Sequence, residues 1–269
     1  MNTPTPKVRR TLLLALSVIT IGISYLWSQN PTAKTTAMPS PGASDDWVHL
    51  TFASVKPDKI LEFNRLQKEE VIPALKQAGV TVRRGFTPGM FAEYYTFVFG
   101  RPFKSFAEFD EQNELVKALG RDAANALTEK LRACLVRSQT FAVRNFPDLS
   151  WAPRTPLAKT IVTEHELAPG RKAEWLAFMR QHYVPAVRST GAKSYIVQET
   201  VFGGSTNQVY TLTGFDRYAD LDGGGLKRKL GDEAYAKLME KLPAGVVLHS
   251  QRWLSNYRPD LSIGPEAKP

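Results

Sequence analysis

Apolar and polar side chains alternate along some short stretches of the chain and recur at helical spacing along others. Residues 47–55 (WVHLTFASV) place alternate apolar side chains on one face, which predicts a strand. Residues 60–75 carry apolar side chains at roughly helical spacing, which predicts an amphipathic helix. Pro73 lies inside that helix and removes a backbone donor, so a bend is expected near Glu70.

The next stretches continue this alternation of strand and helix. Strands are predicted at residues 80–86, 91–99 and 134–143. Ser105-x-x-Glu108 forms a capping box, which predicts the start of a second helical region that reaches about Lys130. The predicted order of elements is therefore β-α-β-β-α-β.

The chain carries one apolar stretch twice. Residues 71–79 (VIPALKQAG) return as residues 183–191 (YVPAVRSTG), and each copy is typical of a helix bent by a proline and stopped by a glycine. The sequence Pro-Asp-Leu-Ser likewise occurs at 147–150 and again at 259–262. Matches in the middle and at the ends of two long stretches indicate an internal duplication.

The duplication predicts where two folded units begin and end. We expect a first ferredoxin-like unit over residues 47–151, a second over 157–262, and a tail over 263–269. The second unit repeats the same order of elements. Its strands are predicted at 159–167, 194–200, 209–215 and 246–254, and its second helical region at 216–241.

The N-terminal residues have the pattern of an export segment. Three basic side chains precede an uncharged, apolar run over residues 11–27 (TLLLALSVITIGISYLW). Residues 1–27 are therefore expected to be a signal peptide or an N-terminal membrane anchor, because the run is long for the first and short for the second. Residues 28–46 are rich in Pro, Ser, Thr and Ala and predict a disordered linker. We expect a periplasmic or extracellular protein that meets a membrane only through this segment, with anchoring in the inner membrane by residues 11–27 as the alternative to cleavage.

Charge and cysteine content narrow the function classes. The formal net charge is +9, but four basic residues lie in the export segment and linker, which leaves 31 basic against 26 acidic side chains. Cys134 is the single cysteine, so no disulfide forms within the chain. RNA-binding domains with this order of elements need a basic-Gly-aromatic pattern on their third strand. Residues 93–99 (EYYTFVF) and 209–213 (VYTLT) lack the basic-Gly element, so no nucleic-acid partner is expected.

Two tandem β-α-β-β-α-β units with a Pro-(Gly/Asp)-(Lys/Arg) helix start and a proline-bent first helix resemble the dimeric α+β barrel superfamily. The second copy, from Leu167-Ala168-Pro169-Gly170-Arg171 through Trp175 and His182 to Pro185, is most similar to NIPSNAP-type and antibiotic-biosynthesis-monooxygenase-type members. The resemblance implies an α+β fold in which the two repeats form one intramolecular barrel with helices outside. It also implies a monomer with an internal pseudo-dimer and a ligand between sheet and helices.

Four side chains of the second unit are candidates for ligand binding. His182 lies just before the bending proline, where a histidine can act as a haem ligand or a general base. Glu164 falls where Phe52 stands in the first unit, which would direct a carboxylate to the barrel interior. Trp175 and Tyr210 add aromatic surface. The alternatives are a solvated histidine, a carboxylate that reaches water, and aromatic core packing.

These features lead to three alternative functions. The first is an exported protein that binds a small apolar or aromatic ligand in a pocket of the second repeat. The second is an enzyme, either a cofactor-free monooxygenase or a haem-handling protein, and the third is an envelope protein-interaction module. His165 and His249 lie on strands expected to be neighbours, but no metal-ligand spacing accompanies them, so no metal and no cofactor are predicted. No catalytic residue is assigned.

Overall fold

A computed structural model describes residues 47–92 and 95–264. The predicted export segment and linker, residues 1–46, lie outside the described residues, as do residues 265–269 of the predicted tail. In the part of the chain that is described, no helix combines the length and the apolar character needed to cross a membrane.

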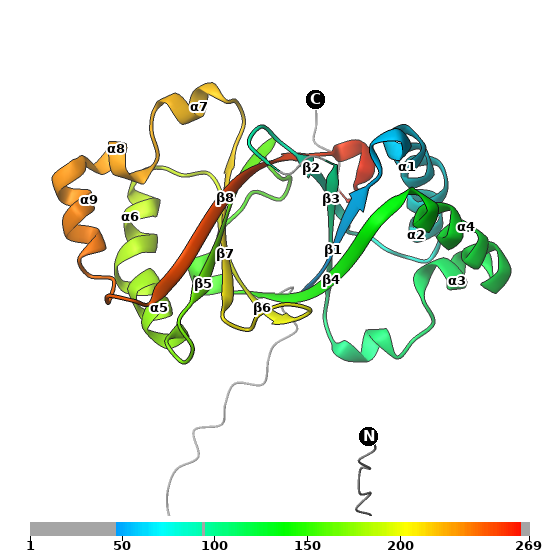
Figure 1. Cartoon of the computed structure of the whole chain (residues 1–269), viewed down its shortest axis with the longest axis horizontal. Helices are drawn as coiled ribbons and strands as arrows, with labels where there is room; N and C mark the ends of the chain where they lie inside the picture. The colour runs from blue at the N-terminus through cyan, green and yellow to red at the C-terminus, as the bar shows by residue number, and fades with distance from the viewer. Residues whose placement is uncertain (1–46, 93–94, 265–269) are drawn as a thin grey trace, which may run out of the picture. The chain divides into compact units, whose positions relative to one another are not determined.

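The strands of the described residues form one closed antiparallel barrel, seen end-on in Figure 1. Around the barrel they follow the order β1-β3-β2-β8-β5-β7-β6-β4. In this part of the chain, closure leaves no strand edge open to pairing with another chain. The strands are β1 (Trp47–Val55), β2 (Arg84–Pro88), β3 (Thr96–Phe103), β4 (Leu135–Asn145), β5 (Lys159–Leu167), β6 (Tyr195–Phe202), β7 (Gln208–Phe215) and β8 (Val247–Tyr257).

Helices lie outside the barrel in two groups, one against each half of the sheet (Figure 1). We call residues 47–151 the first half and residues 157–264 the second half. Each group of helices covers one stretch of the barrel wall. The prediction of an α+β fold with a closed barrel is therefore confirmed. The helices are α1 (Ile60–Leu66), α2 (Ile72–Gln77), α3 (Glu114–Leu119), α4 (Arg121–Cys134), α5 (Lys172–Phe178), α6 (Val184–Ser189), α7 (Ala219–Asp222), α8 (Leu226–Leu230) and α9 (Asp232–Met239).

The bend predicted from the prolines takes the form of a π-helical turn. In the first half this turn, η2 (Gln67–Val71), joins α1 to α2, and in the second half η5 (Met179–Tyr183) joins α5 to α6. Each turn ends just before the helix that carries the proline. Since proline cannot donate a backbone hydrogen bond, widening the preceding turn is one way for a helix to continue past it.

Some element boundaries differ from those predicted. Strands β2 and β3 begin at Arg84 and Thr96, four and five residues later than expected from the apolar pattern. The helical region predicted at 216–241 is divided into three short helices. Glycines account for this division, because the chain leaves α8 at Gly231 with a positive φ of 85°, a conformation that favours glycine.

The buried apolar side chains form two cores, one between sheet and helices in each half. Each core receives a leucine from the opposite half. Leu149 belongs to the 3-10 turn η4 (Pro147–Leu149) at the end of the first half and packs in the second-half core. Leu261 belongs to the 3-10 turn η6 (Pro259–Leu261) and packs in the first-half core. The two Pro-Asp-Leu-Ser sequences therefore lie where the halves interlock.

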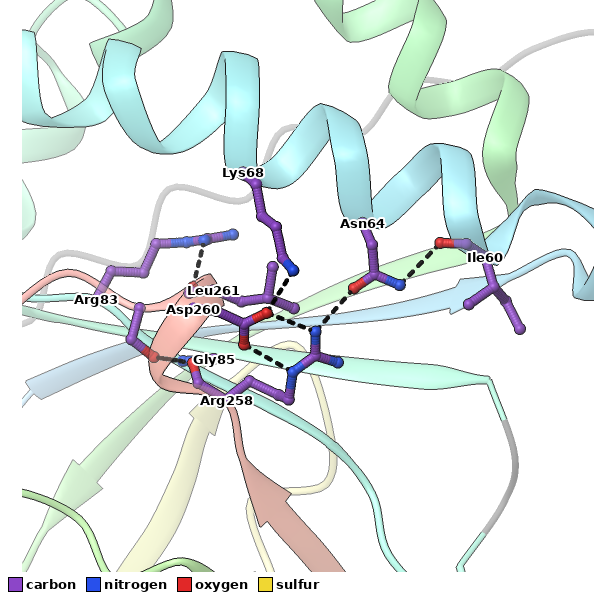
Figure 2. Close-up of polar contacts among 9 residues, drawn as sticks. Ile60, Asn64, Lys68, Arg83, Gly85, Arg258, Asp260 and Leu261 are labelled. Carbon is purple, nitrogen blue, oxygen red and sulfur yellow. Dashed lines mark hydrogen bonds and ion pairs between the residues drawn. The ribbon is translucent and has the colours of Figure 1, made fainter. Parts of the chain in front are cut away.

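Ion pairs hold these crossing turns on the helices of the other half. Figure 2 shows Asp260 beside Lys68 of η2, at 2.6 Å, and beside the Arg258 guanidinium. These two cations hold the pKa of the Asp260 carboxyl well below its usual range. Asp148 of η4 makes the corresponding contact with Arg180 of η5, at 2.6 Å.

Candidate ligand-binding site

A cavity of about 290 Å³ lies between the sheet and the helices of the first half, and we call it the interlayer cavity. Strands β1, β3 and β4 form one wall, and α1, η2, α2, α3 and α4 form the other. Its apolar surface includes Phe63, Leu75 and Phe99, and its polar groups include Arg83 and His49. A mostly apolar space with a few convergent polar groups is the usual form of a small-molecule site.

Arg83 is the most deeply buried charged group on this cavity, with 7% of its surface exposed. Its backbone is fixed by a bridge to Ile263, so the C-terminal segment of the second half positions it. The guanidinium donates to Gln67 Oε1 at 2.7 Å and to the Leu261 carbonyl at 3.0 Å, the second of which Figure 2 shows. Its Cζ lies 3.9 Å from the centroid of the Phe99 ring, which adds a cation–π contact.

The charge of Arg83 has no carboxylate partner among the described residues. Glu114 also lines the cavity, but it is held at 3.0 Å by Arg101. Burial alone lowers the pKa of Arg83 to about 10, so the guanidinium stays charged at neutral pH. A buried charge is costly unless an opposite charge compensates it, so this site is suited to an anion.

His49 provides a second polar group on the wall of the interlayer cavity. Burial, and secondarily the charge of Arg101, lower the pKa of its imidazole below the usual value. The ring lies 5.6 Å from that of Phe109, in an edge-on arrangement. His49 is therefore neutral at pH 7 and able to accept a proton.

A second cavity, of about 550 Å³, lies inside the barrel, and we call it the lumen cavity. Side chains from both halves face each other across it, because strands β1, β3 and β4 contribute one side and β5, β7 and β8 the other. Loops after β2 and β6 reach its rim through Phe91 and Ser205. The lumen cavity shares no lining residue with the interlayer cavity.

The structure brings two of the four sequence candidates together in the lumen cavity. Glu164 and Tyr210 are direct neighbours across β5 and β7, and both line the cavity together with Phe52. Burial, and secondarily the charge of the neighbouring Glu164 carboxylate, raise the pKa of the Tyr210 phenol. Gln251 Nε2 donates to Glu164 Oε1 at 3.1 Å from the other side.

The other two candidates lie in the helical layer on the opposite face of the sheet. Trp175 is 2% exposed in the second-half core, and its ring lies 5.9 Å from that of His165. His182 lies in the π-helical turn η5, with its ring 6.2 Å from that of Phe178. Neither Trp175 nor His182 lines either cavity.

Sequence reasoning missed the residues of the interlayer cavity. Arg83 and His49 lie in strand-like stretches, where a charged or titratable residue is easily taken for a solvent-facing one. A usable signal was present in the pair Arg83-Arg84, because adjacent residues of a strand face opposite sides. One of these two arginines therefore had to point into the core or into the barrel.

The described residues contain no group of three or more His, Cys, Asp or Glu side chains that could hold a metal ion. The volumes and lining residues of the two cavities also argue against the haem alternative. The interlayer cavity, at about 290 Å³, lies at the lower end of the range for drug-sized ligands. A tetrapyrrole is larger than a ligand of that volume, and no histidine is among the described residues that line the lumen cavity. The residues present do not fit a haem in either place.

The closed eight-stranded barrel with helices outside defines a dimeric α+β barrel fold. The solved structures that share it include the following two. One is a candidate monooxygenase from Lactobacillus acidophilus NCFM, with a TM-score of 0.54 and 10% identity, covering 81% of this chain and 95% of that chain. The other is a candidate monooxygenase from Fusobacterium nucleatum subsp. nucleatum, with a TM-score of 0.50 and 12% identity, covering 78% of this chain and 91% of that chain. No protein-family model and no curated protein matches the sequence. At such low identity the likeness concerns the fold alone.

Proposed function

We propose that this protein binds a small aromatic acid in the interlayer cavity. The observation that carries the proposal is the buried Arg83 guanidinium, which has no carboxylate partner in the described part of the chain. Two of its nitrogens already donate to Gln67 and the Leu261 carbonyl, so the group is held in place before a ligand arrives. A guanidinium held in this way can bind a carboxylate or phenolate with little loss of conformational freedom.

The apolar walls favour an aromatic body for the ligand. Phe63, Phe99, Leu75 and Leu131 line the cavity, and the ring of Phe63 lies 6.3 Å from that of Phe99. A flat ring can pack against these side chains while its acid group reaches Arg83. The small volume restricts the ligand to about the lower end of the drug-sized range.

Calorimetric titration of a folded protein starting near Trp47 with benzoate, and with benzamide as its neutral analogue, tests this proposal. Arg83→Met is expected to weaken benzoate binding at least about tenfold, equivalent to ~1.4 kcal/mol. Arg84→Met is the matched control, because Arg84 donates to Tyr257 and the Arg154 carbonyl and does not line the cavity. Benzamide binding as tightly as benzoate, or a folded Arg83→Met variant with undiminished affinity, would contradict the proposal.

A second candidate function is cofactor-free oxygenation in the same cavity. His49 favours it, because a neutral imidazole on the cavity wall can accept a proton from an acidic C–H or O–H group of the ligand. In that case the deprotonated substrate itself would supply electrons to O₂. The two candidate monooxygenases of the same fold are consistent with this reading. Oxygen uptake that needs the aromatic acid and is lost in His49→Asn would support it.

The proposal also covers the evolutionary origin of the two halves and the cellular location of the protein. We propose that the halves descend from two tandem NIPSNAP-like units, residues 47–151 and 157–262, because the order of elements and the crossing leucines correspond. We further propose that residues 1–27 direct the chain across a membrane, as a cleaved signal or as an anchor over residues 11–27. Cell fractionation, with N-terminal sequencing of the mature protein, distinguishes these two forms.

A further inference from the structure

The lumen cavity combines aromatic walls with a fixed carboxylate. Phe52 and Phe141 of the first half contact each other edge-on, with ring centroids 5.2 Å apart. Tyr210 and Trp253 face them from the second half. At about 550 Å³ the space is almost twice as large as the interlayer cavity. It is therefore the larger of the two candidate sites described, and the proposed function does not use it.

Glu164 is held as an acceptor at the wall of this cavity. It lies in one row with Gln251 and Tyr210, its direct neighbours on the strands to either side. Gln251 Nε2 donates to it at 3.1 Å, and the Tyr210 phenol lies beside it. The raised pKa of Tyr210 keeps its phenol neutral across the physiological range. The carboxylate is thus oriented by neutral groups that leave its charge uncompensated.

No basic side chain forms an ion pair with Glu164 in the structure described, nor with Glu166 on the same face of β5. Two arginines contribute atoms to the cavity wall. Arg252 Nε donates to Thr163 Oγ1, and Thr163 faces the helical layer, so this guanidinium is directed out of the barrel. Arg137 is exposed on β4. Arg84 of β2 also faces the inside of the barrel, so this side carries two carboxylates and two arginines, and the negative charge at the cavity comes from Glu164, which has no ion-pair partner in the structure described.

We propose that the lumen cavity is a second ligand site, which binds an organic cation with an apolar body. The aromatic rings Phe52, Phe141, Tyr210 and Trp253 present π-faces and apolar edges, and Glu164 supplies the charge. A cation beside aromatic rings is stabilised by their quadrupoles, and quaternary ammonium groups are recognised in this way. The carboxylate adds a direct Coulombic attraction in a space that is partly shielded from water. This inference is independent of the proposed function, because the two cavities share no lining residue.

Binding of benzyltrimethylammonium, measured by calorimetry and by NMR against neutral benzyl alcohol, tests the inference. In the wild-type protein the cation binds more tightly than the alcohol. Glu164→Gln keeps the acceptor and the shape but removes the charge, and it is expected to weaken cation binding about tenfold. Glu174→Gln is the matched control, because Glu174 is an exposed carboxylate of α5 paired with Arg171, away from the cavity.

A second variant keeps the test decisive if Glu164→Gln folds poorly. Phe141→Leu removes an aromatic face without changing any charge. It is expected to weaken binding of the cation a few-fold and binding of the alcohol by less. Arg137→Met removes the like charge and is expected to leave cation binding unchanged or stronger. Equal binding of alcohol and cation, or cation binding that survives in folded Glu164→Gln and Phe141→Leu, overturns the inference. Retained benzoate binding in these variants shows that the interlayer cavity is intact and that the two proposals stand or fall separately.

Discussion

Leu149 and Leu261 occupy reciprocal positions, each completing the core of the half to which it does not belong. Both are almost wholly buried, with exposures of 1% and 0%. Each sits in a 3-10 turn that follows the last strand of its own half and crosses to the helices of the other. Neither half therefore has a complete core alone, which predicts that the two halves unfold together.

Shortening one of these leucines tests this interdependence. Leu261→Ala leaves a void in the first-half core and is expected to lower the free energy of unfolding by about 2–5 kcal/mol. Urea unfolding followed by far-UV circular dichroism and by tryptophan fluorescence should show one shared transition. Leu61→Ala serves as the control, since Leu61 is 84% exposed and its loss should cost at most about 0.5 kcal/mol. Separate transitions for the two probes would contradict the prediction that the two halves unfold together.

At Gly203, just after β6, the backbone is packed too closely against β4 to leave room for a side chain. It has a positive φ of 91°, and a Cβ built there would overlap the Thr140 carbonyl oxygen on β4. Gly203→Ala is therefore expected to destabilise the protein by about 2–4 kcal/mol, from strain and from separation of β4 and β6. Gly170→Ala has a similar φ of 78° but open space around it, so it should cost only about 1 kcal/mol. If denaturant titrations gave equal losses in the free energy of unfolding for the two variants, the close packing at Gly203 would not be what requires a glycine there.

His165 predicts a loss of stability in acid. Burial, with a smaller contribution from Arg252, lowers the pKa of its imidazole to about 4. Between pH 6.5 and pH 4 the unfolded chain binds a proton that the folded protein does not, so stability falls as the pH falls through this range. His165→Gln should flatten this part of the curve by roughly 1–3 kcal/mol, a range that allows for the partial exposure of the ring. Unfolding free energies at pH 7, 5 and 4 measure the effect, and parallel curves for variant and wild type would contradict it.

The titration of Arg83 predicts how anion binding depends on pH. Burial lowers its pKa to about 10, so the guanidinium remains almost wholly charged from pH 6 to pH 8 and mostly charged at pH 9. Benzoate affinity should be constant from pH 6 to pH 8 and should decline as the pH rises through about 10, because the charge is lost. Calorimetry at pH 7, 9 and 10.5, with circular dichroism to verify the fold, measures this dependence. A steep change between pH 6 and pH 8 would show that a group other than Arg83 controls benzoate binding.

Much of the architecture followed from local sequence patterns. Alternating apolar residues marked β1, and the prolines at 73 and 185 marked the bent helices, because backbone geometry responds to these features at short range. The resemblance of the two units to the dimeric α+β barrel superfamily then predicted the closed barrel. The predicted direction of Glu164 also followed, since strand alternation and the correspondence to Phe52 are properties of the sequence.

Only the tertiary structure decided which chemical groups share a cavity. Sequence placed His182, Trp175, Glu164 and Tyr210 in one unit, but the sheet separates the first two from the last two. Arg83 became a candidate only once the fold buried it against Phe99 and beneath the C-terminal segment of the other half. Local patterns fix which way a backbone runs and which face is apolar. Burial and charge pairing depend on residues far apart in the chain, so they emerge only when the barrel is closed.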